Sequence, residues 1–420
     1  MYDKISPTMS KVPVETPKGS ALSTPKGFRD FLPADSSARA FLLKKLTTTL
    51  EKYGFEPLET PALEFAETLK GKYGEEEKLI FEFTDRGGRA VALRFDQTVP
   101  LARVIAANPS LPKPFKRYQI QPVWRAENPQ KGRFREFLQV DFDTVGTSSL
   151  LADAEIIATA IACLKELGFK NFVMKINDRE IFKELPIEAV RIIDKLAKIG
   201  EVDVVEQLIR TGYTRTESKV LLRKLKGASL TKRLEGLFNF LEISKVDPDK
   251  YAFDPTLARG LDYYTGAIFE LEIEGYSGGS VGGGGRYDSL IGRFTDEPTP
   301  AVGFSFGFDR LIEAAEESNL LPEYQPTARV LVTVFKEELL KESLYLVSKL
   351  RNRGIAAEIS LEPSEKLNKQ LKYADNKGVP YAVILGPEEV KSGTITLKEL
   401  STGEQSSLKE NELVRKLSMK

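Results

Sequence analysis

A change of pattern at Leu320–Pro326 divides the sequence into two parts. Beyond this linker, extended and helical segments alternate, with strands expected at 330–335, 356–361 and 381–385 and helices at 337–353 and 366–377. Alternation at this spacing predicts a separate α/β domain with a central sheet over residues 326–420. The chain has 420 residues, too many for one compact core, so more than one domain is expected on length alone.

The longer part, residues 25–325, predicts an α+β domain on a mainly antiparallel sheet. Extended segments follow one another closely, and helices are expected at 36–53 and 152–167. Residues 186–245 are charged and helical without strand signals, which predicts an inserted helical module. Residues 1–24 are rich in Ser, Thr, Pro and Lys, and predict a flexible tail.

The chain contains one cysteine and no histidine, which excludes several kinds of chemistry. An intramolecular disulfide is impossible, and zinc sites built from Cys and His are excluded. Ser-His-Asp and Cys-His catalysis are excluded because no imidazole can act as base. Cys163 lies in an apolar helical run, which favours a buried structural thiol over a reactive one. Carboxylates, Arg, Lys, Tyr and metal ions remain, which suit phosphoryl and nucleotidyl chemistry.

Charge and targeting signals point to a cytoplasmic protein. Lys+Arg and Asp+Glu balance at 61 each, so a nucleic acid would have to be held by local basic patches. No apolar stretch is long enough to cross a bilayer, so no membrane partner is expected. The first twenty residues hold no apolar block behind a basic end, so no secretory signal is expected, and their acidic residues without Arg argue against a mitochondrial presequence.

Residues Val123–Gly146 carry the most informative chemistry. Two strands are expected around a basic loop, and Arg125 offers a planar fork suited to a phosphate. Phe137 offers a flat face on which a purine can stack. Lys131, Arg133 and Arg135 add positive charge suited to a polynucleotide end. Composition alone would favour an ordinary charged hairpin.

Several further segments remove that ambiguity because they match one family in order. Val123–Gly146 resembles motif 2 of class II aminoacyl-tRNA synthetases, and PQKGRFREF within it is similar to the histidyl branch. LARGLDYYTG (257–266) and GGGGRYDSL (282–290) resemble the two signature peptides of histidyl-tRNA synthetases. The resemblance extends over residues 25–420 through the segments PKGFRDFLP (25–33), LRFDQT (93–98) and PAVGFSFGFDRL (300–311), the last similar to motif 3.

The resemblance implies a histidine–tRNA ligase with a class II catalytic domain and a C-terminal anticodon-binding domain. ATP would be a substrate together with Mg²⁺, and the other partners would be L-histidine and tRNA(His). It also implies a homodimer with 36–53 and 57–61 near its interface. No residue is assigned as a metal ligand. The alternative is a non-catalytic paralogue that acts as a regulatory subunit in histidine biosynthesis. Such relatives typically lack the C-terminal domain and the signature peptides.

Roles in ATP binding follow from the resemblance position by position. Arg125 would bind the α-phosphate, Glu127 the adenine amino group, and Phe137 would stack on the ring. Arg310 would bind the γ-phosphate. Arg259 would lie between the substrate carboxylate and the α-phosphate, as the catalytic arginine beside Arg125; the alternative is a surface arginine beside a glycine turn. The basic loop residues Lys131, Arg133 and Arg135 would meet the acceptor end of tRNA.

The amino-acid pocket is implied in the same way. Asp96, Thr98 and Gln139 would accept hydrogen bonds from the α-ammonium. Asp143 and Tyr264 would bind the two imidazole nitrogens. Asp96 and Asp143 are both expected on inner strands. Tyr263 and Tyr287 would close the wall, although Tyr263 and Tyr264 also fit plain core aromatics. The glycine run Gly282–Gly285 lacks the features of a phosphate-binding loop, and is interpreted as a strand that closely approaches the ligand. Ala126 and Leu138 stand where relatives often carry histidine. Asn128 replaces a basic residue that is common in the family, which leaves the mode of acceptor-stem recognition open.

The absence of histidine from the chain supports a hypothesis about its synthesis. If the protein supplies histidine to tRNA, a histidine-free sequence would let ribosomes make it when charged tRNA(His) is scarce. We therefore expect its synthesis to continue in cells starved of histidine, measured by pulse labelling. A decrease as steep as that of histidine-containing proteins would refute the hypothesis and leave sequence drift as the explanation.

Overall fold

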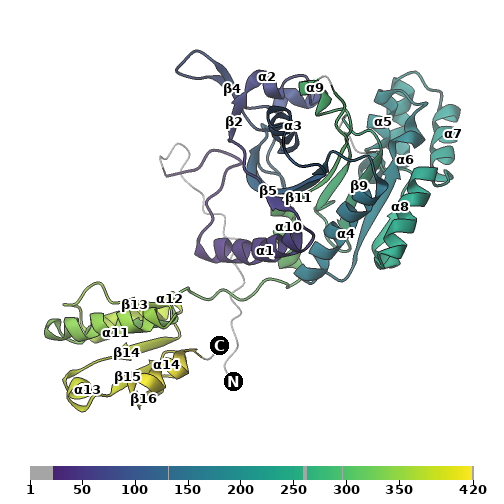
Figure 1. Cartoon of the computed structure of the whole chain (residues 1–420). Coiled ribbons are helices and arrows are strands. Elements are labelled where there is room, and N and C mark those ends of the chain that lie inside the picture. The colour runs from purple at the N-terminus through teal and green to yellow at the C-terminus, as the bar shows by residue number, and fades with distance from the viewer. Residues whose placement is uncertain (1–21, 131, 259–262, 296, 419–420) are drawn as a thin grey trace. The chain divides into compact units, whose positions relative to one another are not determined.

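The computed structural model describes residues 22–130, 132–258, 263–295 and 297–418. The chain forms two compact units, one ending at Leu321 and the other beginning at Pro322 (Figure 1). This division falls inside the linker identified from the sequence. The N-terminal tail expected at residues 1–24 lies almost wholly outside the described residues.

An eight-stranded sheet forms the centre of the first unit, in the order β1-β5-β6-β11-β10-β9-β7-β8. All neighbours pair antiparallel except the two edge pairs, β1 with β5 and β7 with β8. The α+β class and the mainly antiparallel sheet expected from the sequence are confirmed. The strands are β1 (Glu56–Pro57), β5 (Phe115–Trp124), β6 (Glu136–Val145), β7 (Phe172–Asp178), β8 (Tyr251–Phe253), β9 (Ala267–Ile273), β10 (Gly282–Arg286) and β11 (Ala301–Gly307).

Strand β6 shows how the sheet separates the core from a pocket. Successive side chains of a strand point to opposite faces. Val140 and Phe142 are fully buried in the main hydrophobic cluster. Gln139, Asp141 and Asp143 alternate with them and line the pocket on the other face. A single strand therefore contributes to both the core and the candidate site.

Three helices cover the core face of this sheet: α1 (Pro33–Lys52), α4 (Leu150–Leu167) and α10 (Phe308–Glu317). Helix α4 begins where the Ser149 side chain accepts a hydrogen bond from the Leu151 N–H, and ends at Gly168, whose φ of 100° favours glycine. Cys163 on this helix is a free thiol that is fully buried, and burial raises its pKa. The expectation of a structural thiol is confirmed.

A small second sheet and short helices pack over the pocket end of the first unit. Its strand order is β2-β4-β3, formed by β2 (Leu63–Phe65), β3 (Glu82–Thr84) and β4 (Ala90–Leu93). The accompanying helices are α2 (Ala66–Leu69), η1 (Gly74–Leu79), α3 (Thr98–Ala107) and α9 (Gly292–Thr295). A second hydrophobic cluster joins α3 to Tyr263, Tyr264 and Tyr287.

The expectation that Asp96 lies on an inner strand is wrong. Strand β4 ends at Leu93, and Asp96 lies in the turn before α3. Its Oδ1 accepts a hydrogen bond from the Val99 N–H at 3.0 Å. Aspartate side chains favour such turns because they bond to backbone groups a few residues further on.

Residues Ile187–Lys226 form a helical module with its own hydrophobic cluster, whereas the following helix, Lys232–Ile243, packs against α4 in the main cluster. Thr214 and Glu217 make a reciprocal capping box at the start of α7, so the sequence itself marks this helix boundary. The elements are η2 (Arg179–Phe182), α5 (Ile187–Ile193), α6 (Leu196–Arg210), α7 (Arg215–Lys226), α8 (Lys232–Ile243) and η3 (Pro248–Lys250).

The second unit is a five-stranded sheet with helices. Strand order is β13-β12-β14-β15-β16, with β12 parallel to both β13 and β14 and the last two strands antiparallel. The alternating elements from 330 to 385 match the expected ones, whereas the elements after residue 386 were not anticipated. The elements are β12 (Val330–Val332), η4 (Glu337–Leu339), α11 (Leu340–Asn352), β13 (Ala357–Ile359), α12 (Leu367–Lys377), β14 (Tyr381–Ile384), α13 (Pro387–Ser392), β15 (Ile395–Glu399), β16 (Gln405–Leu408) and α14 (Glu410–Ser418).

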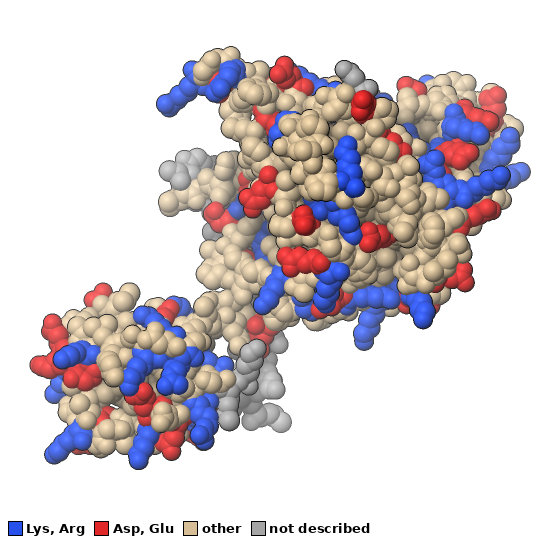
Figure 2. All heavy atoms as spheres, viewed as in Figure 1, with Lys and Arg blue, Asp and Glu red and all other residues tan. Residues whose placement is uncertain are grey.

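The surface carries charges of both signs. Figure 2 shows Lys and Arg side chains interspersed with Asp and Glu over the face in view, as the balanced composition predicts. Among the described helices, none has the length and apolar character needed to cross a membrane.

Candidate active site

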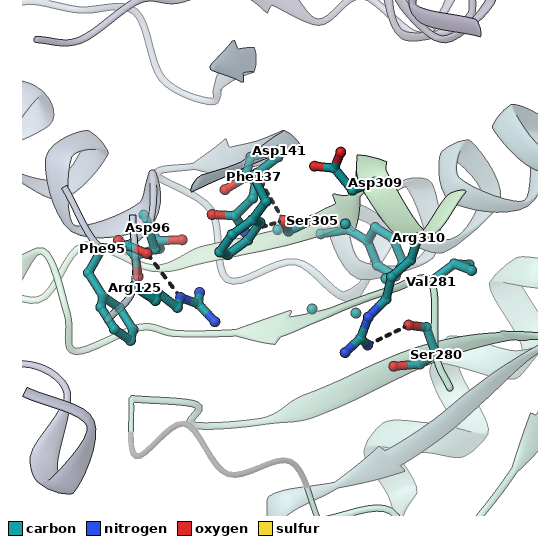
Figure 3. Close-up of a pocket in the computed structure, with 18 of the residues that line it drawn as sticks. Phe95, Asp96, Arg125, Phe137, Asp141, Ser280, Val281, Ser305, Asp309 and Arg310 are labelled. Carbon is teal, nitrogen blue, oxygen red and sulfur yellow. Dashed lines mark hydrogen bonds between the residues drawn. The ribbon is translucent and has the colours of Figure 1, made fainter. Parts of the chain in front are cut away.

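A pocket of about 390 Å³ lies on the face of the main sheet opposite the core. Its walls come from strands β6, β10 and β11, from the turn before α3, and from the start of α10. Figure 3 shows that side chains from these distant segments converge on it. All the sequence-predicted site residues that the structure describes line this pocket, except Arg135.

One end of the pocket is strongly acidic. Asp96, Asp141 and Asp143 are 5%, 2% and 3% exposed and line the same cavity. Burial is the main cause that raises the pKa of each carboxyl group. Buried acids are costly unless cations or hydrogen-bond donors compensate them. This end is therefore suited to a ligand that carries a positive charge and several N–H groups.

Asp143 is held by two partners. Arg117, fully buried on β5, forms an ion pair with its Oδ2 at 2.7 Å. The Tyr287 hydroxyl donates to its Oδ1 at 2.5 Å. The ion pair favours the charged carboxylate and opposes the effect of burial on the pKa of Asp143. Asp143 is therefore a fixed acceptor in the wall of the cavity, and Arg117 favours its charged form.

Tyrosines form the wall beside Asp143. Tyr263 and Tyr264 are 4% and 8% exposed, with ring centroids 4.8 Å apart. Tyr263 packs edge-on against Tyr287 at 5.9 Å. These rings belong to the second hydrophobic cluster and also line the pocket. Tyr263 and Tyr264 are therefore core aromatics, which the sequence analysis allowed as an alternative. They also line the pocket in which the sequence analysis placed them.

Asp96 is held by a residue that the sequence did not indicate. The buried Tyr73 hydroxyl donates to Asp96 Oδ1 at 2.9 Å. Thr98, which begins α3, lines the same part of the pocket. Tyr73 lies in no recognised motif, so only the packing of the segment before β3 onto the turn could reveal this contact.

Two arginines also line the pocket, at separate places in Figure 3. Arg125, just after β5, lies beside Phe95 and Asp96, and Arg310 on helix α10 lies beside Ser280. Arg125 Nε donates to the Phe95 carbonyl at 3.2 Å, and its guanidinium lies 5.2 Å from the Phe137 ring centroid. Phe137 itself lines the cavity as a flat apolar face.

Arg310 is placed where an anion would be favourable. Its guanidinium donates to the carbonyls of Gly132 at 3.3 Å and Ser280 at 3.0 Å. Burial lowers the pKa of Arg310, and the charge of nearby Arg133 lowers it further. A bound anion would relieve both effects, since it neutralises adjacent positive charges.

The loop after β5 folds back on the pocket. Arg133 forms an ion pair with Glu127 at 3.2 Å, and both line the cavity. Arg135 Nε donates to the Glu127 carbonyl at 3.0 Å, and its side chain packs beside Gly27. The predicted nucleotide-binding Glu127 is therefore paired within the loop in this structure.

Two predicted residues, Arg259 and Lys131, lie outside the described residues. Besides Tyr73, the sequence analysis did not identify Asp141, Ser305 or Arg117. A signal existed for Asp141, because a two-residue repeat on β6 places it on the same face as Gln139 and Asp143. Ser305 and Arg117 lie on neighbouring strands, and their positions depend on strand register.

The glycines of β10 and β11 allow the strands and the acidic residues to approach closely. A Cβ atom added to Gly284 would lie 2.0 Å from the Gly303 carbonyl oxygen, and one added to Gly303 would lie 1.8 Å from Asp143 Oδ1. Side chains are therefore excluded at these positions. The interpretation of Gly282–Gly285 as a strand beside the ligand site agrees with its place in β10.

Comparisons with known proteins agree with this architecture. The family model for histidyl-tRNA synthetase matches residues 27–202 and 202–311, and the model for an anticodon binding domain matches 329–420. A histidine–tRNA ligase of Cytophaga hutchinsonii is 39% identical and covers 94% of this chain and 99% of its own. One of Rhodopirellula baltica is also 39% identical, over 92% and 95%. The crystal structure of histidyl-tRNA synthetase from Nostoc sp. PCC 7120 has a TM-score of 0.81 at 31% identity, over 94% and 98%.

The fold is therefore that of a class II aminoacyl-tRNA synthetase with an added anticodon-binding domain. Within that class, the chain belongs to the histidyl-tRNA synthetase family.

The close approach at Gly303 yields a prediction about stability. In Gly303→Ala, the new methyl group would overlap the carboxylate of Asp143, which Arg117 and Tyr287 hold in place. Overpacking of this kind costs about 1–3 kcal/mol, so the thermal unfolding temperature should fall. Gly307→Ala on the same strand is the control, since its nearest contact would be an ordinary 3.8 Å. Equal unfolding temperatures for the two variants would contradict the prediction.

Proposed function

We propose that this chain is a histidine–tRNA ligase. It activates L-histidine with ATP to histidyl-adenylate and pyrophosphate, and then transfers histidine to the 3′ end of tRNA(His). The observation that carries the proposal is a single pocket lined by three buried aspartates and by Arg125 and Arg310, in a chain of this family. The aspartates suit the ammonium and imidazole of histidine, and the arginines suit the phosphates of ATP.

The ATP end is assigned to four residues. Arg125 binds the α-phosphate, and Phe137 stacks on the adenine. Glu127 accepts from the adenine amino group, which requires its ion pair with Arg133 to open or shift. Arg310 exchanges its bonds to backbone carbonyls for the γ-phosphate. These exchanges are favourable because hydrogen bonds between charged groups are stronger than those to neutral carbonyls.

The histidine end is assigned to the acids and tyrosines. Asp96, Thr98 and Gln139 accept from the α-ammonium. Asp143 and Tyr264 bind the two imidazole nitrogens, and Tyr263 and Tyr287 close the wall. An apolar ring of similar size would leave Asp143 buried without its ligand bond, and such a loss gives strong discrimination.

Activation is an in-line displacement at the α-phosphorus. A carboxylate oxygen of histidine forms the new bond to phosphorus while the bond to the pyrophosphate oxygen breaks. Arg125 and Arg259 stabilise the negative charge that develops. In the second step a ribose hydroxyl at the 3′ end of tRNA attacks the acyl carbon, and AMP leaves. Arg133, Arg135 and Lys131 bind the acceptor end, and the C-terminal unit reads the anticodon.

Magnesium is proposed to enter with ATP. The described residues contain no group of three or more His, Cys, Asp or Glu side chains placed to hold a metal ion by themselves. Magnesium is commonly held by one or two carboxylates together with substrate phosphates. The carboxylates that line the pocket fit an ion that the triphosphate carries. Its charge would neutralise the phosphate oxygens as pyrophosphate leaves.

A homodimer in the cytoplasm is also proposed. The family resemblance places the interface near α1 and residues 57–61. The small second sheet exposes Leu63, Phe65 and Phe83, which are 45%, 50% and 47% exposed. Neighbouring apolar side chains of this size are typical of association surfaces.

The regulatory-subunit alternative receives less support. The chain retains the C-terminal domain over 329–420, and Arg125 and Arg310 both line one pocket. A regulatory paralogue would not need to preserve the complete ATP site.

Amino-acid-dependent exchange of pyrophosphate into ATP tests the proposed function. Exchange measured with each of the twenty amino acids should occur with histidine alone, because only histidine satisfies Asp143 and Tyr264 together. Charging of tRNA(His) with labelled histidine tests the second step. Exchange with another amino acid, or with none, would overturn the assignment.

Arg259 gives a sharper test of the mechanism. We expect Arg259→Ala to reduce the rate of exchange by roughly a hundredfold or more, as expected for the loss of one transition-state donor. Arg223→Ala is the control, since Arg223 lies exposed on α7. An Arg259 variant with a rate close to that of the control would remove Arg259 from the catalytic assignment.

A further inference from the structure

Asp141 lines the pocket but has no role in the mechanism above. It lies on β6 between Gln139 and Asp143 and is 2% exposed. Ser305 on β11 is its direct partner in the antiparallel register. Figure 3 shows the two side chains joined by a hydrogen bond on the floor of the pocket.

These residues and Gln139 form a chain of hydrogen bonds. Ser305 Oγ lies 2.5 Å from Asp141 Oδ1 and 2.7 Å from Gln139 Nε2. A serine hydroxyl has one hydrogen to donate, and an ionised carboxylate can only accept. While Asp141 is ionised, Ser305 must therefore donate to it, and the Ser305 oxygen accepts from the amide NH₂ of Gln139. The carboxylate sets the direction of the whole chain.

The direction of these hydrogen bonds determines which end of the Gln139 amide is left for a ligand. With Nε2 bound to Ser305, the remaining group is the carbonyl oxygen. Gln139 Oε1 is buried and has no hydrogen-bond partner among the described residues. A buried acceptor without a partner carries a desolvation cost that a bound donor removes. An ammonium group is such a donor, since it has three N–H groups and no acceptor.

We propose that Asp141 and Ser305 are positioning residues that orient the amide of Gln139 and so select the α-ammonium of the substrate. This inference rests on the proposed function and deepens it. If these hydrogen bonds ran in the opposite direction, Ser305 would donate to Gln139 Oε1, and the amide NH₂ of Gln139 would face the ammonium. Two donors would then oppose each other in a buried site.

The orientation should depend on pH. The groups that face Asp141 are Arg117 from β5, Asp143 on its own strand, Ser305 from β11 and Asp96 before α3. Burial and the neighbouring acids raise the pKa of Asp141 to about 7, while Arg117 and the Ser305 bond oppose that rise. Protonated Asp141 can donate to Ser305 and so reverse the direction of the hydrogen bonds from Asp141 to Gln139. The affinity for histidine should therefore fall as the pH decreases through this pKa.

The first test replaces Asp141 by leucine in the full-length enzyme. Asp141→Leu removes the acceptor and excludes water, so Ser305 can donate only to Gln139. The KM for histidine in pyrophosphate exchange should rise about tenfold or more, on the scale of a hydrogen bond to a charged group, with the KM for ATP unchanged. In wild type, kcat/KM for histidine should fall as the pH decreases through the pKa of Asp141. This fall should be absent in the variant.

A ligand without the ammonium separates orientation from general damage. Imidazole-4-propionate has the ring and carboxylate of histidine but no α-amino group. Its inhibition constant should be the same for Asp141→Leu and wild type. An equal loss of affinity for histidine and for imidazole-4-propionate would mean that the variant merely distorts the pocket, and would overturn the proposal.

Ser305 provides the matched pair of variants. Ser305→Ala should raise the KM for histidine, since the amide of Gln139 is no longer held, and Ser305→Thr should restore it by keeping the hydroxyl. If Asp141→Leu weakens histidine binding but Ser305→Ala does not, Asp141 acts directly on the ammonium and the positioning role is wrong. Unchanged histidine KM in every variant would also overturn it. Failure of the proposed function is distinguishable, since wild type itself would then show no exchange with histidine.

Discussion

The two-residue repeat of β6 is the constraint on which both the core and the site depend. Its apolar residues, such as Phe142, pack under the sheet, and its polar residues project into the pocket. Moving the register by one residue would bury the carboxylates in the core and expose the apolar side chains to the ligand. Antiparallel pairing with β5 and β11 fixes this register along the whole strand. The stability of the sheet and the chemistry of the pocket therefore cannot be changed independently.

The pocket contains more buried charge than folding alone would favour. Arg117 compensates Asp143, and hydrogen bonds from Tyr73 and Ser305 compensate Asp96 and Asp141 only in part. Burial raises the pKa of all three acids. Such groups are destabilising until a complementary ligand binds, which is a frequent property of functional sites. Under the proposed function, the ammonium group of the substrate and the phosphates of ATP would supply the two missing charges.

Much of the fold follows from local signals. Helix α4 is marked by Ser149 and Gly168, the helical module by its periodicity and capping box, and the second unit by its alternating elements. The local signals fail where the sequence is polar or the turn chemistry dominates. Strand β16, with the sequence Gln-Ser-Ser-Leu, has no apolar repeat and forms because β15 offers an edge to pair with. Asp96 ends a strand-like run because its side chain bonds to the backbone of the following turn.

The sequence by itself determined the family, the two-part organisation and the chemical groups available to the site, because ordered motifs and the absence of histidine are properties of the chain alone. Only the tertiary structure decided which of those groups meet. Arg125 and Arg310 come from distant segments and share one cavity. The contact between Ser305 and Asp141 spans 164 positions in the sequence. Hydrogen bonds depend on distances and angles within a fraction of an ångström, and no periodicity along the chain contains that information.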